Sequence, residues 1–331
     1  MKAFIIALVL VAGTFAQTTE EVNFLWTSWK QAHNKEYENI VVEAQRFANF
    51  VKNYKFIQEW NKAGNTATLA LNEFADLTAE EFGAMYANTF AIPDVADEEM
   101  EVEVNSFASK IGDIPESWDW REHGAVTPVK NQGQCGSCWA FATVASIEGL
   151  YQITGHPLTD FSEQQIVDCD KANYGCQGGW PYKALQYVQQ NGLELQTDYP
   201  YTAKDGVCQY NSAKAIKNLN SGFVYVTPRN PDALKAAIYQ QPVILLVEAD
   251  QSVFQFYSSG VITSGCGTIL NHAVTGVGYG NVSGQEAVYV KNSWGTSWGN
   301  KGYVYISTSK DYNLGLGACG ILAQPQYPKR P

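Results

Sequence analysis

The chain lacks features that would place it in a membrane or cross-link its first part. After its first residues it has no stretch of about 18 apolar residues, so we expect no membrane-spanning helix. All seven cysteines lie after residue 134, which excludes a disulfide within the earlier part. Low-complexity tracts are absent as well, and the apolar content suffices for a sizeable core. A length of 331 residues predicts one large or two-lobed body plus an appended segment.

Positive charge is also scarce, and the charge is unevenly spread. The net charge is −11. Up to Asp113 there are 17 acidic and 8 basic residues, a net of −9, whereas the remainder has 16 and 14, a net of −2. Nucleic-acid binding therefore has no electrostatic support, and we expect no nucleic-acid partner. The asymmetry indicates two parts with different roles.

The first residues are typical of a secretory signal. Met1-Lys2 precede an apolar run from Ala3 to Gly13, and small residues follow up to Ala16. Such a run is too short to span a bilayer, so we expect residues 1–16 to be removed, although a buried N-terminal helix or strand is the alternative. An oxidising compartment predicts disulfides with one cysteine left over. Choosing the free thiol and pairing the rest gives 7 × 15 = 105 arrangements, so counting alone assigns none.

The segment from Asn23 to Asn61 predicts a helix. Five of its residues recur at steps of four, three, four and four, which places them on one helical face: Arg46, Phe50, Asn53, Ile57 and Asn61. The pattern alone also fits an amphipathic helix with its own small core. Further on, Leu69, Leu71 and Phe74 indicate a short strand leading into a turn. Thr78 and Glu81 have the spacing of a capping box, and the acidic, aperiodic residues 92–113 indicate an extended, accessible linker.

The remaining sequence changes from helical to β-type patterns. A helix is expected from Cys138 to about Ile153, among glycine-rich loops. After about residue 223, short β-type runs dominate, at 243–249, 272–279, 287–291 and 302–307. We therefore expect an α+β fold with a helical lobe at about 124–222, a β-rich lobe at about 223–325, and a cleft between them that holds the site.

The stretch QGQCGSCWAF, residues 132–141, contains the strongest chemical signal. Cys138 lies where a glycine-rich loop becomes a helix, so backbone N–H groups and the helix dipole would favour a thiolate. A thiolate needs a partner that holds a proton. Three of the four histidines offer little: His33 lies in the leading segment, and His123 and His156 lie in polar loops.

His272 is the better partner, because it begins a β-type run and the motif NSWG at 292–295 can support it. The Asn292 carboxamide would orient the imidazole, and the Trp294 indole would shield that hydrogen bond from water. Gln132 and the backbone N–H of Cys138 could form an oxyanion hole. Zinc or redox chemistry at the Cys-x-x-Cys spacing is disfavoured, since two further clustered ligands and a βαβ setting are absent. We therefore expect no metal and no cofactor.

These motifs resemble those of papain-like cysteine proteases, of the cathepsin L type. The resemblance covers roughly the last 215 residues. Four stretches beyond the cysteine motif carry it: residues 118–133, 175–181, 271–280 and 290–304. It implies that Cys138 is the nucleophile, His272 the general base and acid, Asn292 the orienting residue, Gln132 the oxyanion donor and Trp294 the shield. It also implies three disulfides, Cys135–Cys176, Cys169–Cys208 and Cys266–Cys319, which leave Cys138 free.

The upstream part, residues 17–113, resembles the inhibitory pro-segment of the same family. The helical face at 46–61 matches the E-R-F-N-I-N pattern, except that Val42 holds the glutamate position. Asn72, Phe74 and Asp76 match the G-N-F-D element, with Ala70 in place of glycine. The resemblance implies a zymogen whose mature domain is 114–331, with its start at Ile114-Pro115. Its destination would be a lysosome or acidic vacuole, or the extracellular space, and we expect a monomer activated by acid.

The resemblance also implies a substrate pocket and an endopeptidase. Six positions would line the pocket for the P2 side chain: Trp180, Pro181, Leu246, Leu270, Ala273 and Gln324. Apolar walls and a neutral amide predict a preference for aliphatic or aromatic P2 residues over arginine. Dipeptide trimming of the cathepsin B type is disfavoured, because the stretch from Cys176 to Cys208 has no long histidine-bearing insertion. The rival functions are a catalytically silent binding or storage homologue and a peptide ligase.

Overall fold

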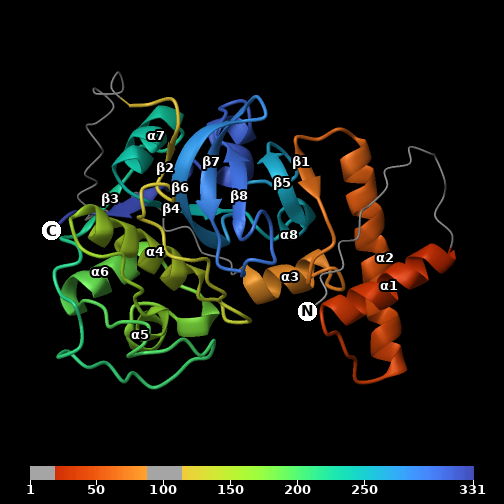
Figure 1. Ribbon diagram of the computed structural model, residues 1–331, viewed down its shortest axis with the longest axis horizontal. Helices are drawn as coiled ribbons and strands as arrows, with labels where there is room; N and C mark the ends of the chain where they lie inside the picture. Colours follow the sequence, from red (N-terminus) through yellow and green to blue (C-terminus); the bar gives the residue numbers. More distant parts are fainter. Residues whose placement is uncertain (1–18, 88–113) are drawn as a thin grey trace.

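The computed structural model describes residues 19–87 and 114–331. The expected signal at 1–16, the linker at 92–113 and the cut near Asp113 lie outside these residues. Helices and a large sheet share the molecule, which confirms the α+β class (Figure 1). No helix in the two described ranges combines the length and the apolar character needed to cross a membrane.

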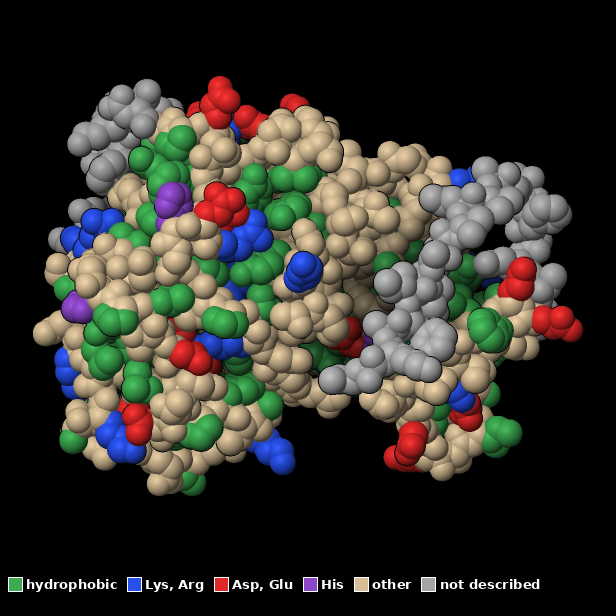
Figure 2. Space-filling model, in the orientation of Figure 1, with side chains coloured by type: hydrophobic (Ala, Val, Ile, Leu, Met, Phe, Trp, Pro, Cys, Tyr) green, Lys and Arg blue, Asp and Glu red, His purple; other side chains and the backbone are tan. Residues whose placement is uncertain are grey.

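The leading part contains three helices and a short strand. They are α1 (Thr19–Ala32), α2 (Ile40–Lys62), β1 (Ala67–Leu69) and α3 (Ala79–Tyr86). The capping box predicted at Thr78 and Glu81 is present at the start of α3. Trp26 and Trp29 of α1 pack on Phe50 of α2, with ring centroids 5.1 and 5.2 Å away. Acidic side chains are visible over this end of the molecule (Figure 2).

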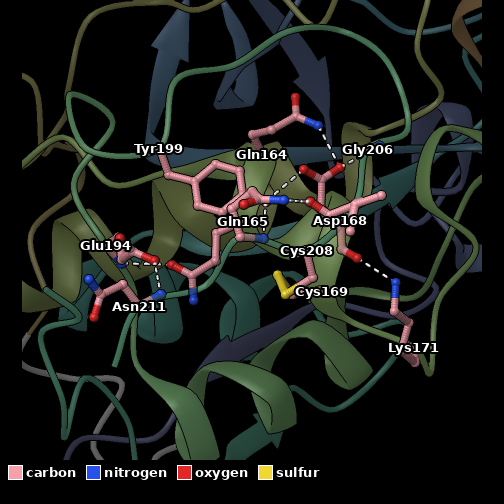
Figure 3. The surroundings of a disulfide bond; sticks show 12 residues. Gln164, Gln165, Asp168, Cys169, Lys171, Glu194, Tyr199, Gly206, Cys208 and Asn211 are labelled. Atoms are coloured by element: carbon pink, nitrogen blue, oxygen red, sulfur yellow. Dashed lines mark hydrogen bonds between the residues drawn. A yellow bond between two sulfur atoms is a disulfide. The ribbon is translucent and has the colours of Figure 1, made fainter. Parts of the chain in front are cut away.

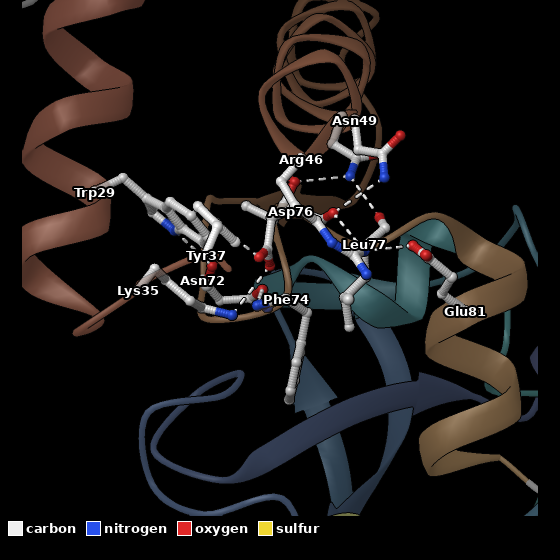
Figure 4. A network of polar contacts seen from close by, with 12 residues as sticks. Trp29, Lys35, Tyr37, Arg46, Asn49, Asn72, Phe74, Asp76, Leu77 and Glu81 are labelled. Carbon is white, nitrogen blue, oxygen red and sulfur yellow. Dashed lines mark hydrogen bonds and ion pairs between the residues drawn. The ribbon is translucent and has the colours of Figure 1, made fainter. Parts of the chain in front are cut away.

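The predicted face of α2 is confirmed. Its polar side chains form hydrogen bonds to the segment that follows β1. Asn53 is buried and donates to the carbonyls of Ala75 and Leu77, at 2.9 and 2.7 Å. Arg46 donates to the Asp76 carbonyl at 3.2 Å and pairs with Glu81 (Figure 4). Because these side chains satisfy backbone carbonyls, the helix needs polar residues on a face that is otherwise apolar.

The helical lobe is built around α4 (Cys138–Ile153), as the sequence predicts. Most of its residues are buried, and α5 (Glu163–Cys169), η2 (Gly175–Gln177) and α6 (Pro181–Asn191) lie in the same lobe (Figure 1). Three disulfides join Cys135 to Cys176, Cys169 to Cys208 and Cys266 to Cys319. These are the pairs that the resemblance implies. Figure 3 shows the surroundings of the second one.

The β-rich lobe contains most of the sheet. Its elements are β3 (Phe223–Tyr225), α7 (Pro231–Gln240), β4 (Val243–Val247), α8 (Ser252–Gln255), β5 (Tyr257–Ile262), β6 (His272–Val282), β7 (Gln285–Lys291), β8 (Tyr303–Ser307), η3 (Asn313–Gly315), η4 (Ala318–Gly320) and β9 (Gln326–Pro328). The strand order is β1-β5-β8-β7-β6-β4-β9-β3, and β2 (Trp118–Asp119) pairs with β6. The four predicted β-type runs are confirmed as β4, β6, β7 and β8. The sequence analysis named neither α7 nor β5.

The leading part joins this sheet and its core. β1 pairs antiparallel with β5, so a strand from the leader extends the edge of the sheet. Gly260 makes the close approach possible, because its φ is +76° and an added Cβ would lie 2.1 Å from the Thr66 carbonyl oxygen. Buried leader residues such as Phe74 and Phe82 belong to the same apolar cluster as Phe254 of the β-rich lobe.

Candidate active site

The candidate nucleophile is the first residue of α4. Cys138 is the one free cysteine among the described residues, and it is buried. Burial raises the pKa of its thiol to about 11, while the backbone N–H groups of Ala273, Trp139 and Cys138 itself oppose that shift. The Ala273 contact places the sulfur beside the residue that follows His272. The helical lobe and the β-rich lobe thus meet at this thiol.

The His272 ring is oriented by Asn292. Its Nε2 lies 2.7 Å from Asn292 Oδ1, which also accepts the N–H of Ser293 at 2.8 Å. An amide oxygen only accepts, so a neutral ring carries its proton on Nε2. Nδ1 makes no hydrogen bond within the described residues and keeps its lone pair for a proton. Burial lowers the pKa of His272 to about 4, and the hydrogen bond that Nε2 donates to Asn292 opposes this.

Trp294 covers the imidazole. The ring centroids of Trp294 and His272 are 4.6 Å apart, and the indole is almost fully buried. Trp294 is covered in turn by aromatic side chains of the leader, at centroid distances of 5.1 Å from Phe82 and 6.0 Å from Tyr86. The indole therefore lies between the candidate base and the leader.

Gln132 is fully buried, and its amide is held from both lobes. Nε2 donates to the Cys135 carbonyl at 3.0 Å, and Oε1 accepts from Ser293 Oγ at 2.7 Å. The Gln132 N–H also donates to the Ser293 carbonyl at 2.8 Å. With Oε1 bonded to Ser293, the Nε2 side of the amide faces the loop before Cys138. The sequence analysis did not identify Ser293, although this residue lies inside the NSWG motif.

Four of the six residues expected to line the substrate pocket belong to one apolar cluster. Trp180, Leu246, Leu270 and Ala273 belong to one apolar cluster that also contains Cys138. In β4 and β6, Leu246 lies directly opposite Ala273. Pro181 is buried at the start of α6, and Gln324 is half-buried. Both lobes therefore contribute apolar side chains to the cluster that contains the thiol.

A cluster of charges behind the site was not foreseen. Lys130 pairs with Glu148 at 2.9 Å and with Glu163 at 2.6 Å, and all three line a cavity together with Lys291 and Asn292. Glu163 Oε2 is buried and has no hydrogen-bond partner among residues 19–87 and 114–331. Burial lowers the pKa of Lys291 to about 8. Sequence spacing could not reveal this cluster, since its members come from separate segments.

Across residues 19–87 and 114–331 there is no group of three or more His, Cys, Asp or Glu side chains that could hold a metal ion. The expectation that the reaction needs no metal or cofactor stays a prediction. The chain itself supplies a thiol, an imidazole whose Nδ1 has no partner among the described residues, and backbone and amide N–H donors. Such a set suits acyl transfer.

The comparisons with known proteins agree with this chemistry. Residues 114–329 match the papain family of cysteine proteases, and residues 26–82 match the cathepsin propeptide inhibitor domain. Papaya proteinase 4 and papain of Carica papaya are 43% and 41% identical to this chain, with 94% of it and 88% of each relative aligned.

Two solved proforms are similar in structure. The Amb a 11 cysteine protease, a major ragweed pollen allergen, gives a TM-score of 0.83 at 36% identity and covers 95% of this chain and 96% of its own. A digestive procathepsin L2 from the larval midgut of Tenebrio molitor gives 0.83 at 34% identity and covers 93% of this chain and 99% of its own. The chain therefore belongs to the papain family of cysteine proteases and has a cathepsin-type propeptide inhibitor domain ahead of its protease domain.

Proposed function

We propose that this cysteine protease is an endopeptidase that cleaves peptide bonds through an acyl-enzyme on Cys138. The observation that carries the proposal is the 2.7 Å contact between His272 Nε2 and Asn292 Oδ1, which leaves Nδ1 available as the base for the Cys138 thiol. His272 Nδ1 takes the thiol proton of Cys138, the thiolate attacks the peptide carbonyl, and Gln132 and the Cys138 N–H stabilise the oxyanion. His272 protonates the leaving amine and then activates the water that releases the acyl group.

The leader, residues 17–113, acts as an intramolecular inhibitor in this proposal. Three contacts support it: the pairing of β1 with β5, the packing of Phe82 on Trp294, and a bond of 2.8 Å from Ser297 Oγ to Glu73 Oε1. Burial also favours the neutral forms of Cys138 and His272, so the covered pair is poorly prepared for attack.

We further propose that acid releases the leader, and that the cut falls near Asp113 so that the mature chain begins at Ile114-Pro115. The Asp76 carboxylate accepts from Lys35 Nζ and Tyr37 OH, both at 3.0 Å, as Figure 4 shows. The Lys35–Asp76 ion pair is part of what holds the leader in its closed form. The signal and the disulfides support a route through the secretory pathway to a lysosome, a vacuole or the exterior.

Substrate preference follows from the apolar cluster beside the thiol. Leu246, Leu270 and Ala273 belong to that cluster, and apolar side chains of this kind suit aliphatic or aromatic P2 residues. Gln324 adds a neutral amide, which gives a P2 arginine no ion pair. A fluorogenic library varied at P2 tests this proposal, and arginine as the leading residue would contradict it.

The decisive test compares wild type with Cys138→Ala on a fluorogenic peptide that has leucine or phenylalanine at P2. Both proteins are incubated in acid with a thiol reductant, and leader removal is followed on a gel, with added active enzyme where needed. Activity in wild type alone, together with loss of the leader, is the expected result. Silence of both proteins after the leader has been removed would favour a non-catalytic role.

A further inference from the structure

Asn281-Val282-Ser283 is a motif that the proposed chemistry does not use. It is the only Asn-x-Ser/Thr triplet in the 331 residues. In the secretory pathway the asparagine of such a triplet accepts an oligosaccharide, which is bulky and needs a surface position. The triplet alone is a weak signal, so the case for a sugar depends on where the fold places it.

The triplet lies where β6 leaves the core. Residues 272–280 of this strand are buried, and Asn281 is exposed. Asn281 Oδ1 accepts the Gly284 N–H at 2.8 Å, so the hairpin holds the carbonyl side of the amide. An oligosaccharide is attached to the nitrogen, Nδ2, and the product is still an amide whose oxygen accepts. Glycosylation is therefore compatible with the bond to Gly284.

The turn does not explain the serine of the triplet. Val282 and Gln285 face each other across β6 and β7, which leaves Ser283 and Gly284 as a two-residue turn with φ values of 52° and 86°. Turns with positive φ at both positions favour asparagine, aspartate and glycine. Serine is not among the residues that such a turn selects. The exposed hydroxyl of Ser283 is, however, the group that the glycosylation motif requires.

A sugar on this hairpin would lie far from the site and from the leader. His272 begins β6, and Asn281 lies nine residues further along, about 30 Å away in an extended strand. Three strands, β7, β8 and β5, separate β6 from β1 of the leader (Figure 1). Across the hairpin, Asn281 faces Glu286, whose exposed carboxylate pairs with Lys235 at 2.8 Å. This end of the sheet is thus polar and exposed, as a sugar requires.

We propose that Asn281 is an N-glycosylation site of this protease, with a lipid-pyrophosphate-linked oligosaccharide as the donor. In the transfer, Asn281 Nδ2 loses a proton to the transferase and forms a bond to the anomeric carbon of the first sugar. The bond between that carbon and the pyrophosphate oxygen breaks, and the lipid pyrophosphate leaves with the electron pair. The inference rests on the proposed route through the secretory pathway. It places the glycan at the end of β6 opposite His272.

The test expresses the full-length chain in insect cells and treats the purified protein with a peptide N-glycosidase, which removes the glycan and converts its asparagine to aspartate. We expect a mobility shift on a gel and an aspartate at position 281 by mass spectrometry. Asn281→Gln and Ser283→Ala should each abolish the shift, whereas Ser283→Thr preserves the motif and should keep it. Removal of the glycan should leave kcat and KM of the leader-free enzyme unchanged, because the site lies about 30 Å from His272.

Ala213→Thr, in the Asn281→Gln background, is the matched control. It creates a second triplet at Asn211, which is exposed and whose Oδ1 accepts the Ala213 N–H at 3.0 Å, much as Asn281 Oδ1 accepts that of Gly284. Wild type without a glycan would overturn the inference if the control chain carries one or if residues 1–16 have been removed. A shift that survives in Asn281→Gln, or a kcat that changes when the glycan is removed, would also overturn it. No glycan on either chain, with residues 1–16 still attached, would instead overturn the proposed route and the inference with it.

Discussion

At the scale of single residues, Ser293 fixes two side chains of the site at once. Its N–H donates to Asn292 Oδ1 and its hydroxyl donates to Gln132 Oε1. The first bond ensures that an oxygen faces His272, and the second turns the Gln132 Nε2 group toward the thiol loop. One residue thus fixes the orientation of both amides, which would otherwise be free to flip.

Gln132→Ala should therefore lower kcat by on the order of 100-fold while leaving KM nearly unchanged, since it removes one oxyanion donor. Cys138→Ala should lose all measurable turnover, because it removes the nucleophile. Both are measured with the same fluorogenic peptide after leader removal. Gln134→Ala, two positions along the same loop, is the control and should retain most of its activity. Equal losses in Gln132→Ala and Gln134→Ala would contradict an oxyanion role for Gln132.

Glu163 provides a prediction about stability. Burial raises the pKa of its carboxyl, and Lys130 opposes this rise. A raised folded-state pKa means that the native protein holds the proton more tightly than the unfolded chain. The stability that Glu163 contributes is fully present below the pKa of the unfolded chain, about 4.3. It is lost as pH rises toward the pKa of the folded state.

The destabilisation caused by Glu163→Gln should therefore be largest near the unfolded pKa of about 4.3 and smaller at neutral pH. Denaturant unfolding of the full chain in the Cys138→Ala background, over a pH series, measures it. Glu286→Gln removes an exposed pair with Lys235 and should show a small, flat difference. A Glu163→Gln penalty that grows with pH would contradict the assignment.

At the scale of elements, the leader is held by its strand as well as by its helices. Thr66, just before β1, donates to the Val261 carbonyl and lies within hydrogen-bond distance of the Thr263 hydroxyl, both at 2.8 Å. The Val261 N–H donates to the Thr66 carbonyl at 3.2 Å. The joint between leader and protease therefore uses a side chain that leaves with the leader.

Thr66→Val should weaken this joint by about 1 kcal/mol, the net value of one hydrogen bond, and raise the rate of leader removal about fivefold at a fixed pH. The processed enzyme should have unchanged kcat and KM, because it no longer contains residue 66. Thr68→Val is the control, since Thr68 is exposed in the middle of β1. If Thr66→Val and wild type are processed at equal rates, this joint does not limit release.

The elements also show how far sequence reasoning reaches. The helix at 138–153, the face of α2 and the four β-type runs could be predicted because each follows a local period. The bond from Ser293 to Gln132 and the bond between the Ser137 and Tyr201 hydroxyls could not be predicted, because they join residues 161 and 64 positions apart. Such contacts are set by how the two lobes pack, and no spacing within one segment encodes them.

At the scale of the whole molecule, the leader and the protease share one apolar cluster, so release of the leader must expose apolar surface. That cost keeps the zymogen closed until another free-energy term offsets it. His33 supplies one such term. It lies in the leader with Trp29 at a centroid distance of 5.4 Å, and its charged neighbours are Glu73, Lys35 and Asp76.

Burial lowers the pKa of His33, Lys35 adds to this, and Glu73 and Asp76 oppose it. The closed zymogen thus favours the neutral ring, so His33 contributes stability above the unfolded value of about 6.5 that is lost as pH falls through the lowered pKa. His33→Gln cannot take up this proton. Its leader removal should consequently need a lower pH than that of wild type.

The Cys138→Ala zymogen, which cannot cleave itself, is incubated with a trace of active enzyme across a pH series. The measured quantity is the pH at which half of the leader is removed. The exposed His156, which stacks on Tyr151 at 4.1 Å, provides the control variant His156→Gln, whose midpoint should stay at the wild-type value. A midpoint for His33→Gln equal to that of wild type would show that His33 does not set the pH of leader removal. A lower pH midpoint for leader removal in His33→Gln would mean that protonation of His33 helps to open the zymogen. Burial disfavours the charged ring in the closed form, so acid destabilises that form.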